Sequence, residues 1–441
     1  MNSPKLPTND SMKYKSIDNQ LFITNRKRLV ALLKPKSLVV LNANDVLPTN
    51  ADGTLPFKQS TDLFYLTGID QEETILVLFP DHPDPKYREV VFVRETNDHI
   101  AVWEGAKLTK AQTQEVSGIS RVYWTHQFES IFRLMIFEAE NVYLNQNEHT
   151  RNDSRTQTRE ARYVLQFKES YPLHKIERVA PLLHQLRAIK QPQEIELLQK
   201  AIDITKDGFE RILKFVKPGV WEYEIEAEFI HEFIRQRSRG FAYTPIIASG
   251  KNACVLHYIE NNLQCQDGDV MLLDVAAEYA NYNADLTRSI PVNGRYTKRQ
   301  RDVYDAVLRV LKTSRAMLVT GNLWDEYHKE VGAIMEAELL GLGLITKHDI
   351  EKQDPEWPAY KKYFMHGNSH FLGLDVHDVG NKYRKMAAGM VFTCEPGIYI
   401  PEEGLGIRLE NNILITETGP IDLMAHIPIE AEEIEEIMNR V

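Results

Sequence analysis

Two aspartates stand at positions that suggest chemistry rather than ordinary surface solvation. Asp274 lies inside the apolar run Val270–Ala276, where a carboxylate is costly to bury unless a charge or a metal ion compensates it. Asp285 follows 11 residues later. Tyr282 and Asn283 can form a turn between two strands, and one hairpin could then present both carboxylates on the same face. Taken alone, Asp285 fits an ordinary acid beside a turn, whereas Asp274 does not.

The second half of the chain adds histidines and two further acids. The glycine-punctuated stretch Phe364–Asp378 holds three histidines, more than structural roles readily explain. Glu395 ends an apolar run just before a Pro-Gly turn, and Glu410 faces away from the apolar side chains of the alternating segment Gly406–Ile415. The three histidines are His366, His370 and His377.

These segments together supply oxygen and nitrogen donors that could bind metal ions. The set consists of Asp274, Asp285, His370, Glu395 and Glu410. Carboxylates gathered within a few ångströms repel one another strongly unless cations neutralise them. An oxygen-rich site with one imidazole suits Mn²⁺, with Zn²⁺ and Co²⁺ as alternatives. Two such ions about 3.5–4 Å apart activate a water for hydrolysis at neutral pH, so the set predicts a two-metal hydrolase.

The elements that must position these donors follow an order that occurs twice. Helices are expected over 192–216, 221–236, 298–318 and 323–340. Strands are expected near 243–247, 270–276, 284–292, 363–365, 390–395 and 406–416. Pro192 suits the first turn of the first helix, and Thr297 and Gln300 form a possible capping box at the third. Two helices followed by strands, twice over, predicts an α+β domain with an internal duplication.

The part of the chain up to about residue 175 predicts a separate α/β domain. Its expected strands are 37–42, 74–79 and 88–94, and its expected helices are 19–33 and 109–116. The polar stretch Arg151–Arg162 has no apolar period and nearly balanced charges, so we expect it to be a surface loop.

Composition limits the classes of protein to which the chain can belong. Its 52 Lys+Arg and 63 Asp+Glu residues give a formal net charge of −11, which disfavours general nucleic-acid binding. No apolar run is long enough for a membrane span, and the N-terminal segment lacks the apolar centre of a secretion signal. Cys254, Cys265 and Cys394 are too few for a disulfide framework, so we expect a reducing, cytoplasmic location.

Seven motifs carry a resemblance to a known family. They are Leu256–Tyr258 (LHY), Leu272–Val275 (LLDV), Ala284–Gly294 (ADLTRSIPVNG), Met365–Gly380 (MHGNSHFLGLDVHDVG), Cys394–Ile400 (CEPGIYI), Gly406–Asn412 (GIRLENN) and Asn50–Ile69 (NADGTLPFKQSTDLFYLTGI). The chain resembles the aminopeptidase P (Xaa-Pro aminopeptidase) family of metallopeptidases. The resemblance implies an α/β N-terminal domain over 1–175. It also implies, over 176–441, an α+β catalytic domain with the pita-bread (creatinase/aminopeptidase-like) fold and an internal pseudo-two-fold duplication.

The resemblance assigns a role to each candidate metal ligand. Asp274 would chelate one ion, and Asp285 would bridge both. His370 and Glu395 would hold the other ion, and Glu410 would form the second bridge. Glu395 could also accept the proton of the attacking water.

Further residues match positions around the family's metal site. The histidines expected on the substrate side are His257, His366 and His377. Arg408 and Tyr399 match residues that support the site, and Arg408 would orient a ligand carboxylate. Asn411 and Asn412 depart from the family pattern, because many relatives carry acids after this glutamate. The departure leaves the ligand set intact and changes the local charge beside Glu410.

The family also implies a homo-dimer or homo-tetramer. In such oligomers the N-terminal domain of a neighbouring subunit reaches toward the active site. Asp52 and Trp103 match residues that do so, although Trp103 equally fits an aromatic side chain packed within its own domain.

The implied reaction is hydrolysis of the bond between an N-terminal residue and a following proline. The substrates would be proline-containing peptides, and the cofactors would be two divalent ions, Mn²⁺ in the first instance. Prolidase, which splits Xaa-Pro dipeptides, shares nearly the same residues and is the alternative. A pita-bread protein that acts only as a binding module typically lacks one or more ligands, whereas all five are present here.

Overall fold

The computed structural model describes residues 14–440, which form two compact units. One unit ends at Arg187 and the other begins at Ala188. The sequence places the end of the first domain at 175, which is the first residue of strand β6 (Lys175–Arg178). This strand continues the sheet of the first unit, so the boundary between the units comes after it.

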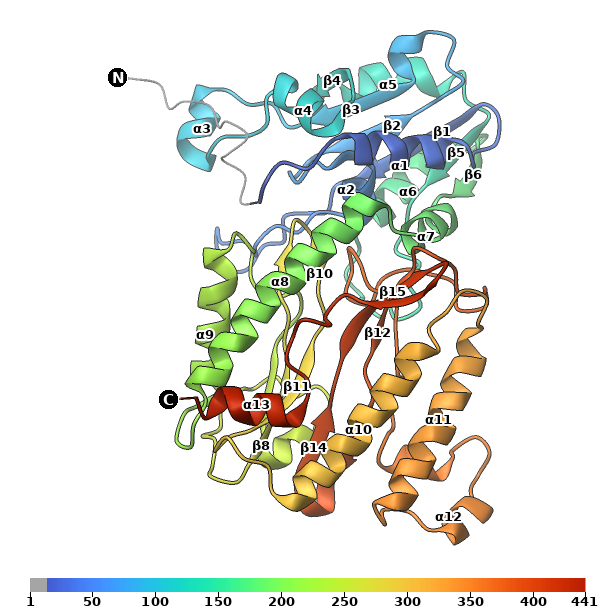
Figure 1. Ribbon diagram of the computed structural model, residues 1–441. Coiled ribbons are helices and arrows are strands. Elements are labelled where there is room, and N and C mark those ends of the chain that lie inside the picture. The colour runs from blue at the N-terminus through green and yellow to red at the C-terminus, as the bar shows by residue number, and fades with distance from the viewer. Residues whose placement is uncertain (1–13, 441) are drawn as a thin grey trace. The chain divides into compact units, whose positions relative to one another are not determined.

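The first unit is built on a six-stranded mixed sheet (Figure 1). Its strands are β1 (Ser37–Asn42), β2 (Ile75–Leu78), β3 (Glu89–Val93), β4 (Arg121–Trp124), β5 (Asn141–Leu144) and β6, in the order β4-β3-β2-β1-β5-β6. Its helices are α1 (Gln20–Val30), α2 (Thr61–Thr67), α3 (Asp98–Glu104), α4 (Lys110–Ser117), α5 (Phe128–Ile136), α6 (Arg159–Ser170) and α7 (Ala180–Ala188). β2 runs antiparallel to both of its neighbours, and the other pairs are parallel. The α/β expectation for this region is confirmed, as are its three strands and two helices.

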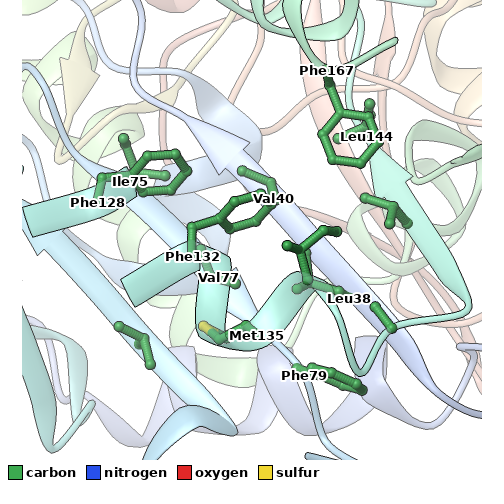
Figure 2. Packing of buried hydrophobic residues seen from close by; sticks show 14 of the residues in the cluster. Leu38, Val40, Ile75, Val77, Phe79, Phe128, Phe132, Met135, Leu144 and Phe167 are labelled. Atoms are coloured by element: carbon green, nitrogen blue, oxygen red, sulfur yellow. The ribbon is translucent and has the colours of Figure 1, made fainter. Parts of the chain in front are cut away.

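Helices α5 and α6 cover one face of this sheet. Their apolar side chains, among them Phe132 and Phe167, pack with Val40 and Val77 of the central strands in a buried cluster (Figure 2). Burial of this apolar area is the main stabilisation of the unit. The loop expected over Arg151–Arg162 is wrong at its end, because α6 begins at Arg159. Thr158 caps that helix by accepting a hydrogen bond from the Ala161 amide, a local signal that outweighs the missing apolar period.

Glu160 gives the first unit a pH-dependent stability. Its carboxylate is buried and accepts hydrogen bonds from the backbone and side-chain nitrogens of Asn42, each at 2.8 Å. Burial outweighs these bonds and raises the pKa of Glu160 to about 8. The folded state therefore holds a proton that the unfolded chain releases above about pH 4.3. Its stabilising contribution is complete at low pH and is lost as the pH rises through about 8.

We expect Glu160→Gln to remove this dependence. Between about pH 6 and pH 8 the wild-type free energy of unfolding should fall by roughly 1 to 3 kcal/mol more than that of the variant. Urea unfolding at the two pH values measures the difference. Glu169→Gln, an exposed change on the same helix, is the control and should keep the wild-type slope. Equal slopes for wild type and Glu160→Gln would contradict the prediction.

The second unit repeats one arrangement of helices and strands (Figure 1). Its first half contains α8 (Pro192–Phe215), α9 (Glu222–Arg235), β7 (Ile246–Ser249), the 3₁₀ helix η4 (Gly250–Cys254), β8 (Val270–Asp274), β9 (Glu278–Tyr279), β10 (Tyr282–Asn283) and β11 (Thr287–Pro291). Its second half contains α10 (Lys298–Ala316), α11 (Trp324–Gly341), α12 (Lys347–Glu351), β12 (Val391–Cys394), β13 (Gly397–Ile400), β14 (Leu405–Arg408), β15 (Asn411–Thr416), β16 (Gly419–Asp422) and α13 (Ala431–Met438). Each half sets two long helices before a three-stranded antiparallel sheet, β11-β8-β7 and β12-β15-β16.

Local signals account for the helix starts in this unit. Pro192 occupies the first turn of α8, and Thr297 and Gln300 form the expected capping box of α10. Each of these helices buries an apolar stripe, so packing adds to the capping. Within residues 14–440, none of the helices combines the length and the apolar character that crossing a membrane would need.

Three expectations for the second unit are wrong in detail. Tyr282 and Asn283 form β10 instead of a turn, and the turn lies at Ala280 and Asn281, which adopt positive φ angles of 51° and 68°. The expected strand at 363–365 is irregular backbone that follows a 3₁₀ turn over Ala359–Lys362. The expected strand at 406–416 is two strands, β14 and β15, which belong to different sheets.

Candidate metal centre

The two halves of the second unit meet where β14 ends and β15 begins. Glu410 lies between these strands, and its backbone amide donates to the carbonyl oxygen of Thr287 at 3.0 Å. The Thr287 hydroxyl donates back to the Glu410 carboxylate, 2.7 Å away. Thr287 is also the β11 residue opposite Asp274 on β8. Because the expected strand 406–416 is divided at Glu410, this residue of the second half lies against β11 of the first half, close to Asp274.

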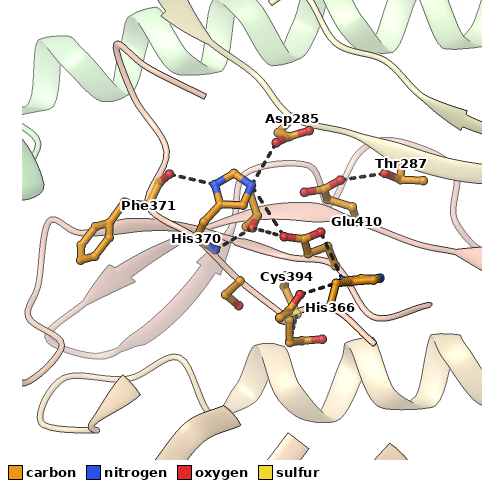
Figure 3. A network of polar contacts seen from close by, with 12 residues as sticks. Asp285, Thr287, His366, His370, Phe371, Cys394 and Glu410 are labelled. Atoms are coloured by element: carbon orange, nitrogen blue, oxygen red, sulfur yellow. Dashed lines mark hydrogen bonds and ion pairs between the residues drawn. The ribbon is translucent and has the colours of Figure 1, made fainter. Parts of the chain in front are cut away.

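Three of the predicted ligands form a compact buried group. Ligand atoms of Asp285, His370 and Glu410 all lie within 4.8 Å of one another. Nε2 of His370 is 3.3 Å from the Asp285 carboxylate and 3.7 Å from that of Glu395. Figure 3 shows the imidazole of His370 between Asp285 and the backbone carbonyl of Phe371.

The orientation of His370 leaves one ring nitrogen for a metal ion. Nδ1 lies 2.9 Å from the carbonyl oxygen of Phe371, which can only accept, so Nδ1 carries the proton. Nε2 then faces the acids, and in the neutral ring it is the nitrogen that could bind a metal ion, as in metal-binding histidines whose other nitrogen is held by a carbonyl. Burial lowers the pKa of His370, but Asp285 and Glu395 outweigh it, and the net pKa is raised.

The electrostatics of the group fit a divalent cation. Burial raises the pKa of Glu410 well above its usual value, and the nearby charges of Asp285, Glu395 and Asp274 raise it further. Burial likewise raises the pKa of Glu395 to about 7. Oε1 of Glu410 is buried without a hydrogen-bond partner among the described residues. An acceptor of this kind, among other acids and one imidazole, is suited to a hard or borderline metal ion.

Asp274 lies beside this group with both of its oxygens already held. Arg408 donates to Oδ2 at 2.5 Å, and the Tyr243 hydroxyl donates to Oδ1 at 2.6 Å. Burial raises the pKa of Asp274 despite the charge of Arg408, and Asp285 adds to the increase. Arg408, which the resemblance expects to orient a ligand carboxylate, contacts Asp274, and its role toward a metal ion stays a prediction. Tyr243 has no counterpart among the residues expected from the sequence.

Arg408 also connects the acids to the predicted histidines. Its Nη1 donates to the Tyr399 hydroxyl at 2.7 Å, and that oxygen lies 2.8 Å from Nε2 of His366. Nδ1 of His366 faces the carbonyl of Gly367 and so carries the proton, which makes Nε2 the acceptor from Tyr399. Burial lowers the pKa of His366 to about 4, with the charge of Arg408 adding to the effect. His366 is thus a neutral imidazole near neutral pH.

The other two histidines are exposed and lie close to the group. The ring of His377 packs edge-to-face against that of His370, with centroids 4.4 Å apart. The charge of His257 acts on His366, which places these two side chains near each other. His257 follows η4, and Gly406 lets β14 approach that turn, since a Cβ at Gly406 would lie 2.3 Å from the Ala253 carbonyl oxygen.

A buried ion pair supports the segment that carries His377. Asp378 accepts from the Lys190 ammonium at 2.9 Å, and each side chain is 1% exposed. The Asp378 carboxylate also accepts from the Val379 amide. Gly373 leaves room for the pair, because a Cβ there would lie 2.2 Å from the Asp378 carboxylate.

The asparagines that depart from the family pattern hold the backbone of the site. Asn412 accepts from the Asp285 amide at 3.1 Å and donates to the Asp285 carbonyl at 2.6 Å. A carboxylate could make only the first of these bonds. Asn411 accepts from the buried guanidinium of Arg288, which also donates to the Glu410 carbonyl. Arg288 was missed by the sequence reasoning, because one arginine in a strand has no distinguishing pattern.

Asp52 and Trp103 lie in the first unit. Both are exposed, and the Trp103 side chain on α3 is 77% exposed, so it is not packed in the core of its own domain. Their expected action on the active site of a neighbouring subunit stays a prediction.

Two family models match the chain. Metallopeptidase family M24 matches residues 196–417, and the aminopeptidase P N-terminal domain matches residues 22–143. The Xaa-Pro aminopeptidases of Haemophilus influenzae and Escherichia coli are 35% and 36% identical, over 95% and 96% of this chain and 97% and 98% of their own. The solved structure of Zn-substituted E. coli aminopeptidase P in complex with product has a TM-score of 0.85 at 34% identity, covering 96% of this chain and 99% of that one.

The chain belongs to metallopeptidase family M24, as its pita-bread catalytic unit and buried acids indicate. Within that family it is a metallo-aminopeptidase of the aminopeptidase P type, because the characteristic N-terminal domain is also present and the similarity runs along almost the whole chain. The resemblance and the pita-bread expectation are therefore confirmed. The H. influenzae and E. coli relatives are both named as Xaa-Pro aminopeptidases and not as prolidases.

Proposed function

We propose that the enzyme releases the N-terminal residue from peptides with proline at the second position, using two divalent metal ions. The observation that carries the metal proposal is the buried Glu410 oxygen without a partner, beside Asp285 and His370. Mn²⁺ is the proposed metal, with Zn²⁺ and Co²⁺ as alternatives, because the donors are carboxylates and one imidazole. The specificity rests on the relatives, which are named as Xaa-Pro aminopeptidases.

The proposed ligands are the five residues of the sequence motifs. Asp285 and Glu410 would bridge, His370 and Glu395 would hold one ion, and Asp274 would hold the other. Asp274 enters the ligand set already oriented by Arg408 and Tyr243. The bound ions would supply polarisation of the substrate carbonyl and a lowered pKa for the attacking water.

The remaining chemistry falls to side chains around that group. Glu395, with a pKa raised to about 7, is suited to accept a proton near neutral pH. The proline nitrogen has no N–H for the enzyme to recognise, and it must gain a proton as it leaves. We propose that the substrate-side histidines His257, His366 and His377 position the scissile carbonyl, and that His257 and His377 supply this proton and stabilise the oxyanion. His366 enters as a neutral imidazole whose tautomer is fixed by Tyr399 and the Gly367 carbonyl.

The cellular setting is also a proposal. Cys254, Cys265 and Cys394, all within residues 14–440, are free thiols, which suits a reducing cytoplasm. We propose a homo-dimer or homo-tetramer in which Asp52 and Trp103 act from the neighbouring subunit. The neighbouring exposed side chains of Val102 and Trp103 support this assignment, because contiguous exposed apolar groups are typical of contact sites.

A matched pair of peptides tests the reaction. Enzyme stripped of metal is assayed with Ala-Pro-Ala and Ala-Pro, with and without added Mn²⁺. We expect free Ala from the tripeptide only when metal is present, because the carbonyl is not polarised otherwise. Ala-Ala-Ala serves as the control for proline specificity and should be cleaved poorly.

Two results would contradict the proposal. Cleavage of Ala-Pro alone would reassign the enzyme as a prolidase. If neither peptide is cleaved and no metal is bound after dialysis against Mn²⁺, the proposal of a dinuclear metal site is contradicted.

A further inference from the structure

The first unit contains a cavity that is separate from the metal centre. Its volume is about 300 Å³, and it lies where β1 ends at Asn42, with Ile75 of β2 forming part of the wall. The first turn of α5 and the first two turns of α6 complete the wall. Cavities that bind small molecules begin at about this size, so the space suits a ligand no larger than an amino acid.

Arg159 brings a positive charge without a partner to this cavity. Within residues 14–440 its guanidinium makes no hydrogen bond or ion pair, although the side chain is half-buried. Burial lowers the pKa of Arg159, as expected for a cation that loses water without gaining a direct partner. The neighbouring Arg162 differs, because it pairs with Asp45 at 2.7 Å. Arg159 is thus available to an anionic ligand.

Glu129 brings the opposite charge from α5. No ion pair or hydrogen bond of its carboxylate occurs in the described part of the chain, and it does not pair with Arg159 across the cavity. Its charge contributes to the raised pKa of Tyr163, which places the carboxylate on the side of the cavity that Tyr163 lines. The cavity therefore presents one cationic and one anionic group that are not satisfied by each other.

The rest of the wall is mixed. Asn42, Arg162 and Gln166 contribute polar groups, and Ile75, Phe128 and the ring of Tyr163 form an apolar patch. Phe128 and Ile75 lie side by side on the α5 face of the sheet (Figure 2). Tyr163 of α6 packs against the same cluster. An apolar surface between two separated charges is complementary to a zwitterion with an apolar side chain. A phosphate ion would satisfy Arg159 but would be repelled by Glu129, and a neutral apolar molecule would leave both charges unpaired.

We propose that this cavity binds a free α-amino acid with an aromatic or branched apolar side chain. The α-carboxylate pairs with Arg159, the α-ammonium group pairs with Glu129, and the side chain packs against Phe128 and Tyr163. The binding proposal does not rest on the proposed peptidase activity, although that reaction releases a ligand of the same class.

Calorimetric titration of the full chain in the presence of Mn²⁺ tests the proposal, with L-phenylalanine as the probe. We expect saturable binding in the millimolar range or tighter, and at least about tenfold weaker binding to Arg159→Gln, the effect of losing one hydrogen bond to a charged group. Lys168→Gln, an exposed change on the same helix, should bind as the wild type does. Phenethylamine lacks the carboxylate and 3-phenylpropanoate lacks the ammonium group, so each should bind more weakly than L-phenylalanine.

A second variant separates this cavity from the metal centre. His370→Ala should retain L-phenylalanine binding, because His370 lies in the other unit. Loss of binding in His370→Ala with retention in Arg159→Gln would place the ligand at the metal centre and overturn the proposal. Absence of saturable binding to the wild type, or inorganic phosphate binding more tightly than L-phenylalanine, would also overturn it. If circular dichroism shows Arg159→Gln unfolded, Glu129→Gln decides, since it should lose the preference for L-phenylalanine over 3-phenylpropanoate.

Discussion

Glu410→Gln is expected to make the metal-free enzyme more stable while it removes most of the peptidase activity. In the wild type, Oε1 of Glu410 is buried without a hydrogen-bond partner in the described chain, and the carboxylate faces other acids. The glutamine oxygen can still accept from Thr287, and its amide can donate toward Asp285. Relief of an unsatisfied buried group should raise the free energy of unfolding by roughly 1 to 3 kcal/mol.

The carboxyl group of Glu410 also determines how the stability of the metal-free enzyme changes with pH. Burial and the neighbouring acids raise the folded-state pKa of Glu410, so the wild-type protein without metal loses stability as the pH rises toward that value. Glutamine does not titrate, and the advantage of the variant should therefore be larger at about pH 8 than at about pH 5.5. Thermal unfolding of metal-free proteins at the two pH values measures it.

Although Glu410→Gln should be more stable than the wild type without metal, its peptidase activity should be lower. If Glu410 is a metal ligand as proposed, its loss removes several kcal/mol of Lewis-acid stabilisation, so kcat/KM for Ala-Pro-Ala should fall by about 10³-fold or more. Glu417→Gln, an exposed change in the turn after β15, is the matched control and should alter neither quantity. A variant that is less stable than the wild type without metal and still active would show that Glu410 is structural and not a ligand.

The positions of the candidate ligands Asp274 and Glu395 could be predicted from the sequence because each is an acid in or beside an apolar run. An aspartate at the end of an apolar strand and a glutamate between an apolar strand and a Pro-Gly turn are visible within a few residues. The expected strands over 270–276 and 390–395 are close to the observed β8 and β12. The hydrophobic pattern within a few residues predicts such strands without any information about distant contacts.

The supporting residues could not be predicted, because their partners are distant in the chain. Tyr243 donates one hydrogen bond to Asp274, and Asn412 makes two hydrogen bonds with the backbone of Asp285. Hydrophobic periodicity in the sequence does not indicate contacts of this kind. The alternating segment 406–416 predicts one strand for the same reason. Its division depends on the bond from the Glu410 amide to the Thr287 carbonyl, a contact between the two halves of the unit.

Arg408→Met is expected to lower the free energy of unfolding of the metal-free enzyme by about 3 to 5 kcal/mol, the cost of breaking a buried pair from one side. Arg408 is 4% exposed, and its guanidinium donates to Asp274, Tyr399 and Thr287. Without it, Asp274 would be a buried carboxylate held only by the Tyr243 hydroxyl. Arg408→Lys should lower the free energy of unfolding less, because lysine keeps the positive charge. It should still be less stable than the wild type, because one ammonium group cannot reproduce all three hydrogen bonds of the guanidinium.

Added Mn²⁺ should show whether Arg408→Met is destabilised by loss of the positive charge or by loss of side-chain packing. If Asp274 is a ligand, a divalent ion supplies the missing positive charge, and Mn²⁺ should raise the melting temperature of Arg408→Met more than that of the wild type. Arg299→Met breaks the exposed pair with Glu403 and should cost no more than about 1 kcal/mol, with an ordinary response to Mn²⁺.

The same substitution should change the ionisation of His366. The charge of Arg408 helps to hold the pKa of His366 at about 4, so its removal should raise that pKa. Imidazole resonances followed by NMR as a function of pH report the shift directly. A pKa for His366 that is unchanged in Arg408→Met would mean that burial alone keeps the imidazole neutral. Arg408 would then serve Asp274 and not the substrate-side histidines.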